Sequence, residues 1–265
     1  LTARMKDTLA LWEKVNAFQQ CGIVYQMGEE QVPVDAAVVC DWIALNEDGS
    51  FALDEQNALQ LRENAVEEFI DRLADEYDTV GASRQFRATR GETVTVEGGI
   101  YGNKLDRKAE VKYLKEAFQD GRRETHEPAY TQMAWKQGKD DIGGTYVEVD
   151  MGEQMMYYYV DGVQKLSTPV VTGNTSRRMG TPSGVNYVYL KQRNRVLRGP
   201  GYASPVDFWM PVKGGIGIHD ASWRSRYGGT IYQTNGSHGC INTPRDVMVE
   251  LYDSVEVGTP VVMFY

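Results

Sequence analysis

The sequence predicts an α+β domain over residues 1–138 and a mostly β domain over residues 139–265, and three observations lead to this division. In the first half, apolar residues recur at three- and four-residue steps, the period of amphipathic helices. Positions 134–144 are polar and rich in glycine, which is typical of a boundary between domains. After them, apolar and polar residues alternate as they do in half-buried strands.

Three helices are expected in the first domain. The first should end at Gly22, and one of its faces carries Leu9, Leu11, Trp12, Val15 and Phe18. The second is longer and should begin near Asp54, with an apolar face formed by Val66, Phe69, Ile70, Leu73 and Tyr77. Asp106 is suited to cap a third helix that runs through Phe118 and stops before Gly121.

Strands and tight turns are expected elsewhere. Residues 84–96 alternate in polarity and lead to a turn at Gly98-Gly99. Residues 146–150 and 155–160 are rich in strand formers, and the following Asp161-Gly162 is a two-residue hairpin turn. A helix is predicted to start after Pro244. The last strand, residues 260–264, is continuously apolar and should therefore lie in the middle of its sheet.

Composition and charge argue against several classes of function. A hydrophobic content of 42% is enough to build a core, so global disorder is not expected. Residues 142–265 hold 11 Lys/Arg and 10 Asp/Glu, which leaves 17 and 27 for residues 1–141, and an acidic first half argues against nucleic-acid binding. The sequence also lacks the run of about 18–20 apolar residues that a membrane-spanning helix needs.

The three cysteines are too few and too far apart for a disulfide scaffold or a zinc ribbon. Cys21 and Cys40 could still pair with each other. Cys240 is then left over, and it follows a histidine in the stretch Ser237-His238-Gly239-Cys240. A second histidine, His219, lies at the end of a predicted buried strand over residues 215–220. Two of the chain's three histidines are therefore expected near this thiol.

This arrangement suits nucleophilic catalysis by cysteine. A thiol attacks a carbonyl as thiolate, and its ordinary pKa of about 8.5 means that a base or a cation has to assist it at neutral pH. His219 and His238 are both candidate bases, and spacing alone leaves the choice open. Asp220 could orient the ring of His219. The backbone N–H groups of Gly239 and Cys240 could stabilise an oxyanion, while Ser237 and Asn242 could hold the loop.

Two other interpretations of the same residues stay open at this point. A cysteine in a glycine-flanked loop is often buried and inert. His219, Asp220, His238 and Cys240 could also bind zinc, although the C-x-x-C or H-x-x-x-H spacing typical of such sites is missing. We expect neither a metal nor another cofactor.

Residues 191–198 form a basic run that fits a long hairpin or flap over the sheet. Arg193, Arg195 and Arg198 could attract the carboxylates of a substrate. An ordinary solvated edge strand, protected by its charges, explains the same run equally well.

At His219 and at Ser237-His238-Gly239-Cys240-Ile241-Asn242, the sequence resembles the L,D-transpeptidases, cysteine enzymes that cross-link the bacterial cell wall. Further matching segments are Val170-Val171-Thr172-Gly173, Thr181-Pro182-Ser183-Gly184 and Ala221-Ser222-Trp223, and together the likeness covers about 120 residues. It implies a β-sandwich or barrel with a flap and one helix. Sortases and papain-like endopeptidases fit less well. Papain-like endopeptidases place the cysteine before the histidine, which is the reverse of the order here.

The first half resembles the peptidoglycan-binding domain that precedes the catalytic domain in some Gram-positive members. The residues that carry this likeness are Tyr77-Asp78-Thr79, Arg84 to Phe86, and Gly98-Gly99-Ile100-Tyr101-Gly102. The two resemblances imply a protein of cell-wall biogenesis and cell shape that works on the extracellular face. They also imply an N-terminal membrane anchor outside this sequence.

The resemblance implies a 3→3 cross-linking reaction. Cys240, activated by His219, would attack the third residue of a tetrapeptide stem, expel the terminal D-Ala and pass the acyl group to a neighbouring stem. Asp220, His238 and Gly239 would complete the catalytic set, and Ser237, Asn242, Trp223, Tyr187 and Arg193 would bind substrate. Carbapenem β-lactams would be covalent inhibitors of what we expect to be a monomer. The alternatives are an L,D-carboxypeptidase and a non-catalytic wall-binding protein.

Overall fold

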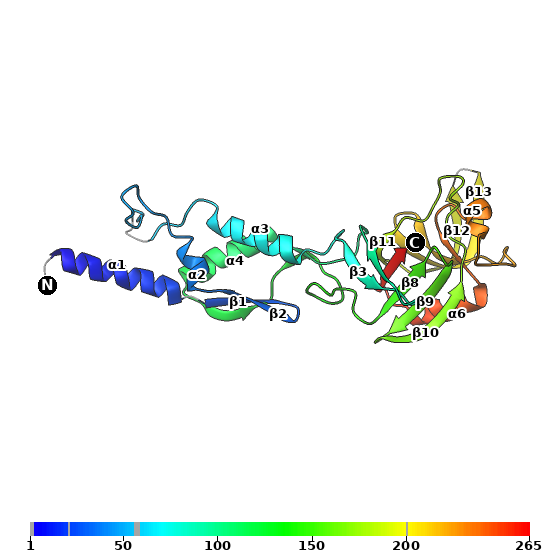
Figure 1. The fold of residues 1–265 in the computed structure, drawn as a ribbon, viewed down its shortest axis with the longest axis horizontal. Coiled ribbons are helices and arrows are strands. Elements are labelled where there is room, and N and C mark those ends of the chain that lie inside the picture. The colour runs from blue at the N-terminus through cyan, green and yellow to red at the C-terminus, as the bar shows by residue number, and fades with distance from the viewer. Residues whose placement is uncertain (1–2, 21, 56–58, 200) are drawn as a thin grey trace. The chain divides into compact units, whose positions relative to one another are not determined.

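A computed structural model describes residues 3–20, 22–55, 59–199 and 201–265 (Figure 1). The chain divides into two compact units. The first comprises residues 1–78, 103–133 and 137–139, and the second comprises residues 79–102, 134–136 and 140–265. The sequence predicted one boundary at residue 138. The structure divides the chain at several points instead, because the segment from Thr79 to Gly102 packs within the second unit.

The first unit combines helices with a small sheet. Its helices are α1 (Ala3–Gln20), α2 (Ala36–Cys40), α3 (Ala65–Tyr77) and α4 (Arg107–Gln119). Strand β1 (Gly22–Met27) lies between antiparallel β2 (Glu30–Val34) and parallel β6 (Arg123–His126), while β5 (Lys104–Leu105) pairs with β7 (Tyr130–Gln132). One face of α3 packs with Ile23, Tyr25, Trp42 and Leu114 in a single core.

Two of the predicted helices begin or end as expected, and one does not. Gly22 follows α1, and the side chain of Asp106 caps α4 by accepting from the backbone N–H of Ala109 at 3.1 Å. The second helix, however, begins at Ala65 rather than near Asp54. Residues 43–55 instead pair with one another and with residues 59–61 through isolated bridges such as Ile43–Leu61 and Leu53–Leu59, which bond the backbone groups that a helix would need.

Two predictions at the N-terminal end concern side chains that are exposed or lie outside the described residues. The apolar face of α1 is largely exposed, with Leu9 at 48% and Trp12 at 62%, and the side chain of Phe18 lies outside the described part. The Cys21–Cys40 pair also falls outside it, because Cys21 is not among the described residues. Within the described ranges, every helix is too short or too polar to cross a membrane.

The second unit is built on two sheets that share one core. The five-stranded sheet has the order β10-β9-β8-β16-β11, and the four-stranded sheet has the order β12-β13-β14-β15. The bounds of these strands are β8 Tyr146–Asp150, β9 Met155–Val160, β10 Val163–Pro169, β11 Gly184–Tyr187, β12 Gln192–Gly199, β13 Tyr202–Lys213, β14 Ile216–Asp220, β15 Ile241–Thr243 and β16 Pro260–Phe264. Apolar side chains of both sheets pack with α6 (Arg245–Ser254), and α5 (Ile231–Asn235) is a short additional helix.

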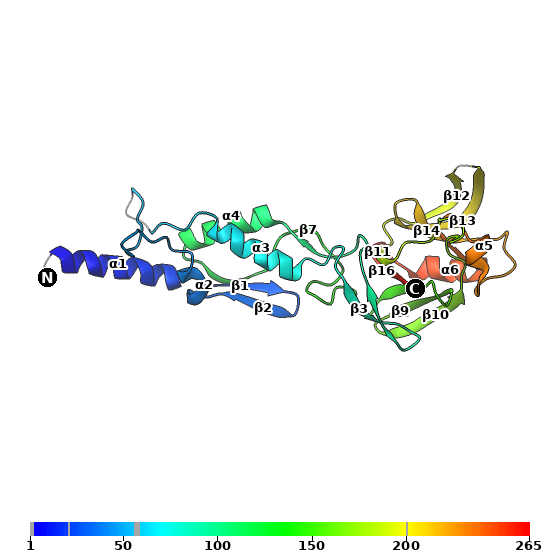
Figure 2. The same cartoon turned by 45° about the horizontal axis from the view of Figure 1, so that its top comes forward.

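The predictions for this unit are confirmed in their main features. It is mostly β, and the Asp161-Gly162 turn joins β9 to β10 with both residues at positive φ. Strand β16 lies between β8 and β11 and is buried along its whole length, as its apolar run predicted. The basic run falls in β12, which pairs with β13 in a long hairpin that extends from the unit (Figure 2). Residues 192–199 and 202–213, the β12–β13 hairpin, are called the flap below.

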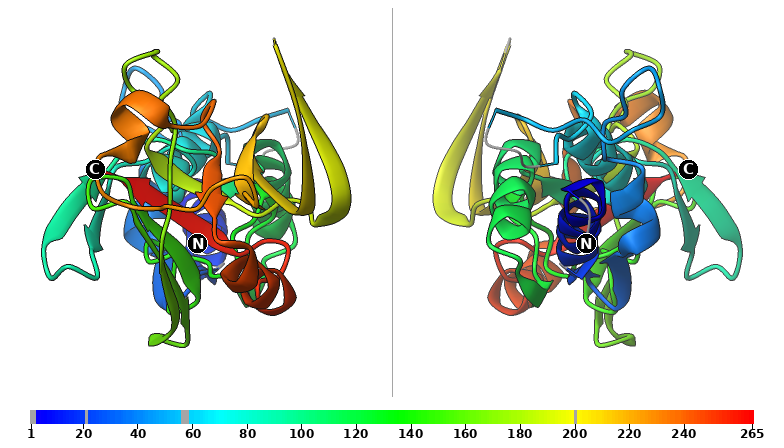
Figure 3. Two further views of the ribbon diagram at one scale, coloured as in Figure 1. Left: turned by 90° about the vertical axis from the view of Figure 1, so that its right-hand side faces the viewer. Right: turned by 90° about the vertical axis from the view of Figure 1, so that its left-hand side faces the viewer.

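A second hairpin, β3 (Arg84–Arg87) with β4 (Thr93–Val96), lies on another side of the same unit (Figure 3). Its connecting loop binds two buried carboxylates of β8. The backbone N–H of Thr89 donates to Glu148 Oε1 at 2.9 Å, and its hydroxyl donates to Oε2 at 2.7 Å. Arg90 forms an ion pair of 3.0 Å with Asp150.

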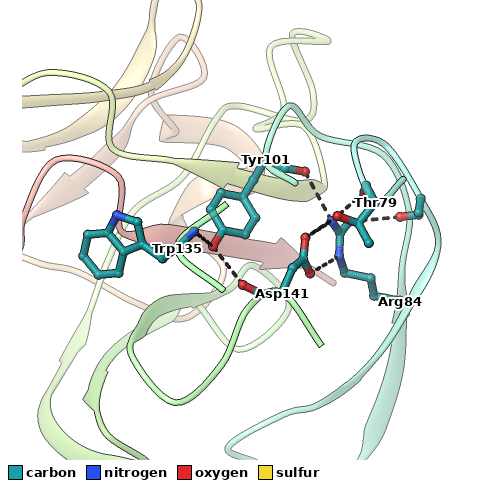
Figure 4. Close-up of polar contacts among 6 residues, drawn as sticks. Thr79, Arg84, Tyr101, Trp135 and Asp141 are labelled. Atoms are coloured by element: carbon teal, nitrogen blue, oxygen red, sulfur yellow. Dashed lines mark hydrogen bonds and ion pairs between the residues drawn. The ribbon is translucent and has the colours of Figure 1, made fainter. Parts of the chain in front are cut away.

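The segment that carries this hairpin is held at its base by a buried ion pair (Figure 4). Arg84 donates from Nε to Asp141 Oδ1 at 3.0 Å and from Nη2 to Oδ2 at 2.7 Å. The hydroxyl of Thr79 donates to the same carboxylate at 2.7 Å. Tyr101 Oη donates to the carbonyl oxygen of Asp141 at 2.8 Å and accepts from the backbone N–H of Trp135 at 3.1 Å. These contacts fasten residues 79–102 to Trp135 and Asp141 within the second unit.

Candidate active site

The four-stranded sheet brings the predicted histidine and cysteine segments together. Strand β14 delivers His219 near its carboxyl end, and β15 runs parallel to it with Asn242 opposite His219. Cys240 immediately precedes β15, so the thiol comes from a loop that is fixed to the neighbour of the histidine strand. His219, Cys240, His238, Ser237, Trp223 and Asn242 line one cavity of about 160 Å³.

The ring of His219 is buried and held on both sides. Its Nδ1 lies 2.7 Å from the carbonyl oxygen of Asp220, and because a carbonyl only accepts, Nδ1 must carry a proton. Trp209 and Trp223 approach the ring with centroids at 5.9 Å each. Burial lowers the pKa of His219 below its ordinary value, and the nearby cation of Arg224 acts in the same direction. The ring is therefore neutral at pH 7, with Nε2 as its unprotonated nitrogen.

Cys240 is half-buried, and its surroundings favour the protonated form of the thiol. Sγ lies 3.7 Å from the carbonyl oxygen of Gly215, to which it donates. Burial raises the pKa of Cys240 above its ordinary value, which favours a neutral thiol over a thiolate. A neutral thiol beside a neutral imidazole needs a proton transfer to become a nucleophile.

The loop before Cys240 is closed by hydrogen bonds from Ser237. Its hydroxyl donates to the carbonyl oxygen of Cys240 at 2.5 Å and accepts from the backbone N–H of Gly239 at 3.0 Å. Thr181 then donates to the carbonyl oxygen of Gly239 at 2.7 Å. Gly239 adopts a φ of +118°, which side chains rarely permit. Because Ser237 already binds the Gly239 N–H, this group is not free for an oxyanion in the structure.

Asp220 contacts His219 through its backbone rather than through its carboxylate. The carboxylate is buried and accepts from the backbone N–H of Phe208 on β13 at 2.8 Å. The side chain thus joins β14 to β13, whereas its carbonyl oxygen orients the imidazole. The sequence singled out Asp220 for its carboxylate, whereas in the structure its backbone oxygen contacts the ring.

His238 lines the same cavity but contacts the flap. Its ring stacks on Tyr202 of the flap at a centroid distance of 4.4 Å and an interplanar angle of 23°. It is exposed, whereas His219 is only 3% exposed. The structure therefore separates the two histidines that spacing alone could not distinguish: one is buried against β15, and the other contacts the flap.

A second cavity, of about 470 Å³, reaches Cys240 from the flap side. Its lining includes the flap residues Arg195, Arg198 and Tyr202, together with Tyr189 and Gly215. Cys240 lines both cavities, together with Leu197 and Tyr202 of the flap.

Two of the predicted substrate-binding residues lie outside these cavities. Arg193 is paired with Asp253 of α6 at 3.1 Å, and its guanidinium lies over the rings of Phe208 and Tyr252. Tyr187 packs against Tyr101 and Tyr189 at the edge of a separate apolar cluster. Arg193 thus anchors the flap to α6, and Tyr187 supports Tyr189, which does line a cavity.

Several cavity residues were not singled out from the sequence. Arg224, Tyr202, Ser204 and Leu197 line the cavity that holds His219 and Cys240. Arg224 follows the histidine strand by four positions and carries a charge, which could have drawn attention to it. Tyr202 and Leu197 belong to the flap, and only the hairpin register brings them to the thiol. Among the described residues, no group of three or more His, Cys, Asp or Glu side chains could hold a metal ion.

A loop cysteine and a buried histidine, which adjacent strands bring to one cavity, define the class of proteins with a candidate cysteine–histidine site. Comparisons with known proteins agree with this class. Residues 144–263 match the family model for the L,D-transpeptidase catalytic domain (YkuD), and residues 45–126 match a "Putative peptidoglycan binding domain". A search of curated proteins found no match.

Solved structures extend the likeness over nearly the whole chain. The C→S mutant of the Enterococcus faecium L,D-transpeptidase is 34% identical with a TM-score of 0.82, over 96% of this chain and 99% of that one. The carbamoyl enzyme formed by Ldtfm and avibactam gives the same identity and TM-score over 98% and 99%. The ertapenem-acylated catalytic domain of the E. faecium enzyme is 48% identical over 46% and 98%, with a TM-score of 0.42.

The chain belongs to the L,D-transpeptidase family. The family and the fold class predicted from the sequence are both confirmed.

Proposed function

We propose that this protein forms 3→3 cross-links between peptidoglycan stems through a thioester on Cys240. The observation that carries the proposal is the buried His219, whose Nδ1 is held by a carbonyl oxygen while its unprotonated Nε2 shares a cavity with the thiol. A base in this state can accept a proton from a neutral thiol at neutral pH.

The first half-reaction releases the terminal D-Ala of the donor stem. His219 Nε2 takes the thiol proton, Sγ attacks the carbonyl carbon of the third stem residue, and the oxyanion forms. With the Gly239 N–H bound to Ser237, we assign the N–H of Cys240 to that oxyanion. The C–N bond then breaks, and the imidazolium gives its proton to the departing amine of D-Ala.

The second half-reaction transfers the acyl group. A side-chain amine of the third residue in a neighbouring stem attacks the thioester, His219 accepts its proton, and the C–S bond breaks to restore the thiol. The presence of Cys240 in two cavities supports this order, because the donor can remain in one while the acceptor enters through the other.

The decisive experiment incubates the protein with a defined disaccharide-tetrapeptide and follows the products by mass spectrometry. Transpeptidation gives D-Ala and a dimer linked through the amine of the third residue. Tripeptide without dimer would instead identify an L,D-carboxypeptidase that uses water as acceptor. Cys240→Ala is the control, and an absence of both products from folded wild-type protein would favour a non-catalytic wall-binding role.

Carbapenems provide a second test of the nucleophile. The relatives with avibactam and ertapenem in their structures form a carbamoyl enzyme and an acyl-enzyme. We propose that Cys240 of this chain is acylated in the same manner, and that the first unit contributes wall binding on the outer face of the cell. An adduct on Cys240→Ala would contradict the first assignment, and equal sedimentation with cell walls after loss of the first unit would contradict the second.

A further inference from the structure

Arg224 contacts the catalytic pair through Asn242, whose side-chain amide lies between Arg224 and His219. A guanidinium has only hydrogen-bond donors, so the amide oxygen has to face it. In that orientation, the oxygen accepts from Arg224 Nε at 2.6 Å and from Nη2 at 3.3 Å. The amide nitrogen then faces His219 Nε2 at 3.2 Å.

The resulting chain of hydrogen bonds has one direction. It begins at the guanidinium, which can only donate, and ends at the carbonyl oxygen of Asp220, which can only accept. Between these ends, Asn242 donates to Nε2, and Nδ1–H donates to Asp220. Only one neutral tautomer of His219 satisfies every member of the chain.

We propose that Arg224 is a positioning residue that keeps His219 in the tautomer with a protonated Nδ1 and a basic Nε2, acting through the amide of Asn242. This inference rests on the proposed function, in which Nε2 takes the thiol proton. It assigns to Arg224 a part in the reaction that does not require contact with the substrate.

Reversing the amide shows what Arg224 prevents. With the Asn242 oxygen toward the ring, both ring nitrogens would face acceptors, and the imidazolium would satisfy both. Burial lowers the pKa of His219, and the charge of Arg224 lowers it further, whereas Asp220 raises it. Besides Arg224, the other ionisable side chains that line the cavity are Cys240, His238 and Tyr202, and the rings of Trp209 and Trp223 carry no charge. Loss of Arg224 should therefore raise the pKa of His219.

The same geometry favours turnover. Nε2 has one lone pair, so the thiol proton replaces the Asn242 N–H there, and the new Nε2–H then faces the N–H groups of Asn242 instead of an acceptor. The imidazolium then lacks a partner at Nε2, which makes it a stronger acid toward the leaving amine. The proton passes from Sγ to Nε2 and on to the amine of D-Ala, while a C–S bond replaces the C–N bond.

The test is an NMR measurement on unreacted enzyme. The chain has three histidines, and two-bond ¹⁵N–¹H spectra distinguish protonated from unprotonated ring nitrogens for each. In wild type, we expect His219 to carry its proton on Nδ1 alone at pH 7. In Arg224→Met, we expect protonation of both nitrogens to persist to higher pH, with the pKa of His219 raised by about one unit. Arg226→Met removes a charge from the same segment at an exposed position and is the matched control.

Carbapenem acylation gives the kinetic counterpart. Arg224→Met should slow acylation about tenfold at pH 6 and less at pH 8, because the raised pKa removes the free base mainly at low pH. Arg224→Lys, which keeps a charge and a donor, should retain the wild-type tautomer. Should Arg224→Met fail to fold, Arg224→Gln removes the charge while keeping a polar side chain of similar length.

An unchanged tautomer and pKa in Arg224→Met or Arg224→Gln would overturn the proposal, even with a slower reaction, since slowing alone fits a structural role. The proposed function has a separate readout, because it fails if wild type releases no D-Ala from tetrapeptide stems. The tautomer result can stand in that case.

Discussion

His219 and His238 have different environments although both lie near Cys240. His219 is fixed by Asp220 and Asn242 within the sheet, while His238 is exposed and stacks on Tyr202. Under the proposed mechanism, the first is the base, and the second shapes the loop that contacts the flap.

Substitution of each histidine by alanine tests this division. His219→Ala should lower the acylation rate by about 10³-fold, the usual contribution of a general base. His238→Ala should lower it by less than about tenfold, because it removes an aromatic stack worth about 1 kcal/mol. Stopped-flow acylation by a carbapenem measures both rates. Equal losses in the two folded variants would contradict the division.

The pH dependence of acylation should follow the lowered pKa of His219. Because the reaction needs the neutral ring, the rate should stay near its maximum as the pH falls through 6.5 and decline only below that value. The lowered pKa of His219 moves the acidic limb of the pH–rate profile to lower pH. The raised pKa of Cys240 keeps the resting thiol neutral across that pH range. An acidic limb centred above pH 7 in a rate profile would contradict the assignment of His219 as a buried base.

The sequence predicted which residues meet at the site better than which atoms interact. The spacing of His219 and Cys240 was enough to place both beside one cavity. It could not show that Asp220 uses its backbone oxygen, that Ser237 binds the Gly239 N–H, or that Arg224 reaches Asn242. Such choices depend on the relative position of three strands and a loop, which local sequence does not encode.

At the scale of elements, the structure separates the flap arginines into two roles. Arg193 bonds to Asp253 of α6, whereas Arg195 and Arg198 line the second cavity beside Cys240. The interpretation of this basic run as a flap that attracts substrate carboxylates thus fits Arg195 and Arg198, whereas it does not fit Arg193. β12 is the edge strand of its sheet, and only part of its charge faces the cavity.

Charge reversal in the flap should therefore depend on position. The double substitution of Arg195 and Arg198 by Glu should raise KM for an acidic stem about fivefold with little change in kcat, because exposed charges contribute up to about 1 kcal/mol each. Arg193→Glu should leave KM nearly unchanged and instead weaken the contact of the flap with α6. Steady-state kinetics at low ionic strength provide the measurement, and a larger effect of Arg193→Glu on KM would reverse the assignment.

Elements were predicted best where periodicity extended over many residues. β16, the Asp161-Gly162 hairpin and the Asp106 cap all follow from local patterns. The helix expected near Asp54 starts at Ala65, because residues 43–53 form isolated bridges with one another and with residues 59–61. Local periodicity cannot reveal such pairing.

At the scale of the molecule, the second unit depends on the ion pair of Arg84 and Asp141. The side chains are 8% and 1% exposed, so removing one partner leaves the other buried without compensation. Arg84→Met should reduce the free energy of unfolding of this unit by about 3 kcal/mol. Chemical denaturation measures the loss. The double variant Arg84→Met/Asp141→Leu should recover part of it, and no recovery would indicate that the polar contacts of Thr79 and Tyr101 carry the stability.

The buried Glu148 gives a pH-dependent prediction for the same unit. Burial raises the pKa of its carboxyl, so its stabilising contribution is fully present below its unfolded pKa and is lost as the pH rises through its folded pKa. Glu148→Gln should therefore raise the free energy of unfolding at pH 8 relative to wild type by about 1 kcal/mol and change it little at pH 4. Chemical denaturation at the two pH values provides the test. An equal change in the free energy of unfolding at pH 4 and pH 8 would contradict the prediction.

The path of the chain between its two units has a consequence for fragments. Residues 79–102 and 140–265 belong to one unit, while residues 103–133 between them belong to the other. A single cut by a protease therefore cannot release both units whole. A fragment that starts at residue 139 would lack Thr89 and Arg90, leaving Glu148 and Asp150 without these partners. Conversely, a chain nicked between residues 102 and 140 should keep its N-terminal piece bound through the Arg84–Asp141 contact, and the two pieces should elute together.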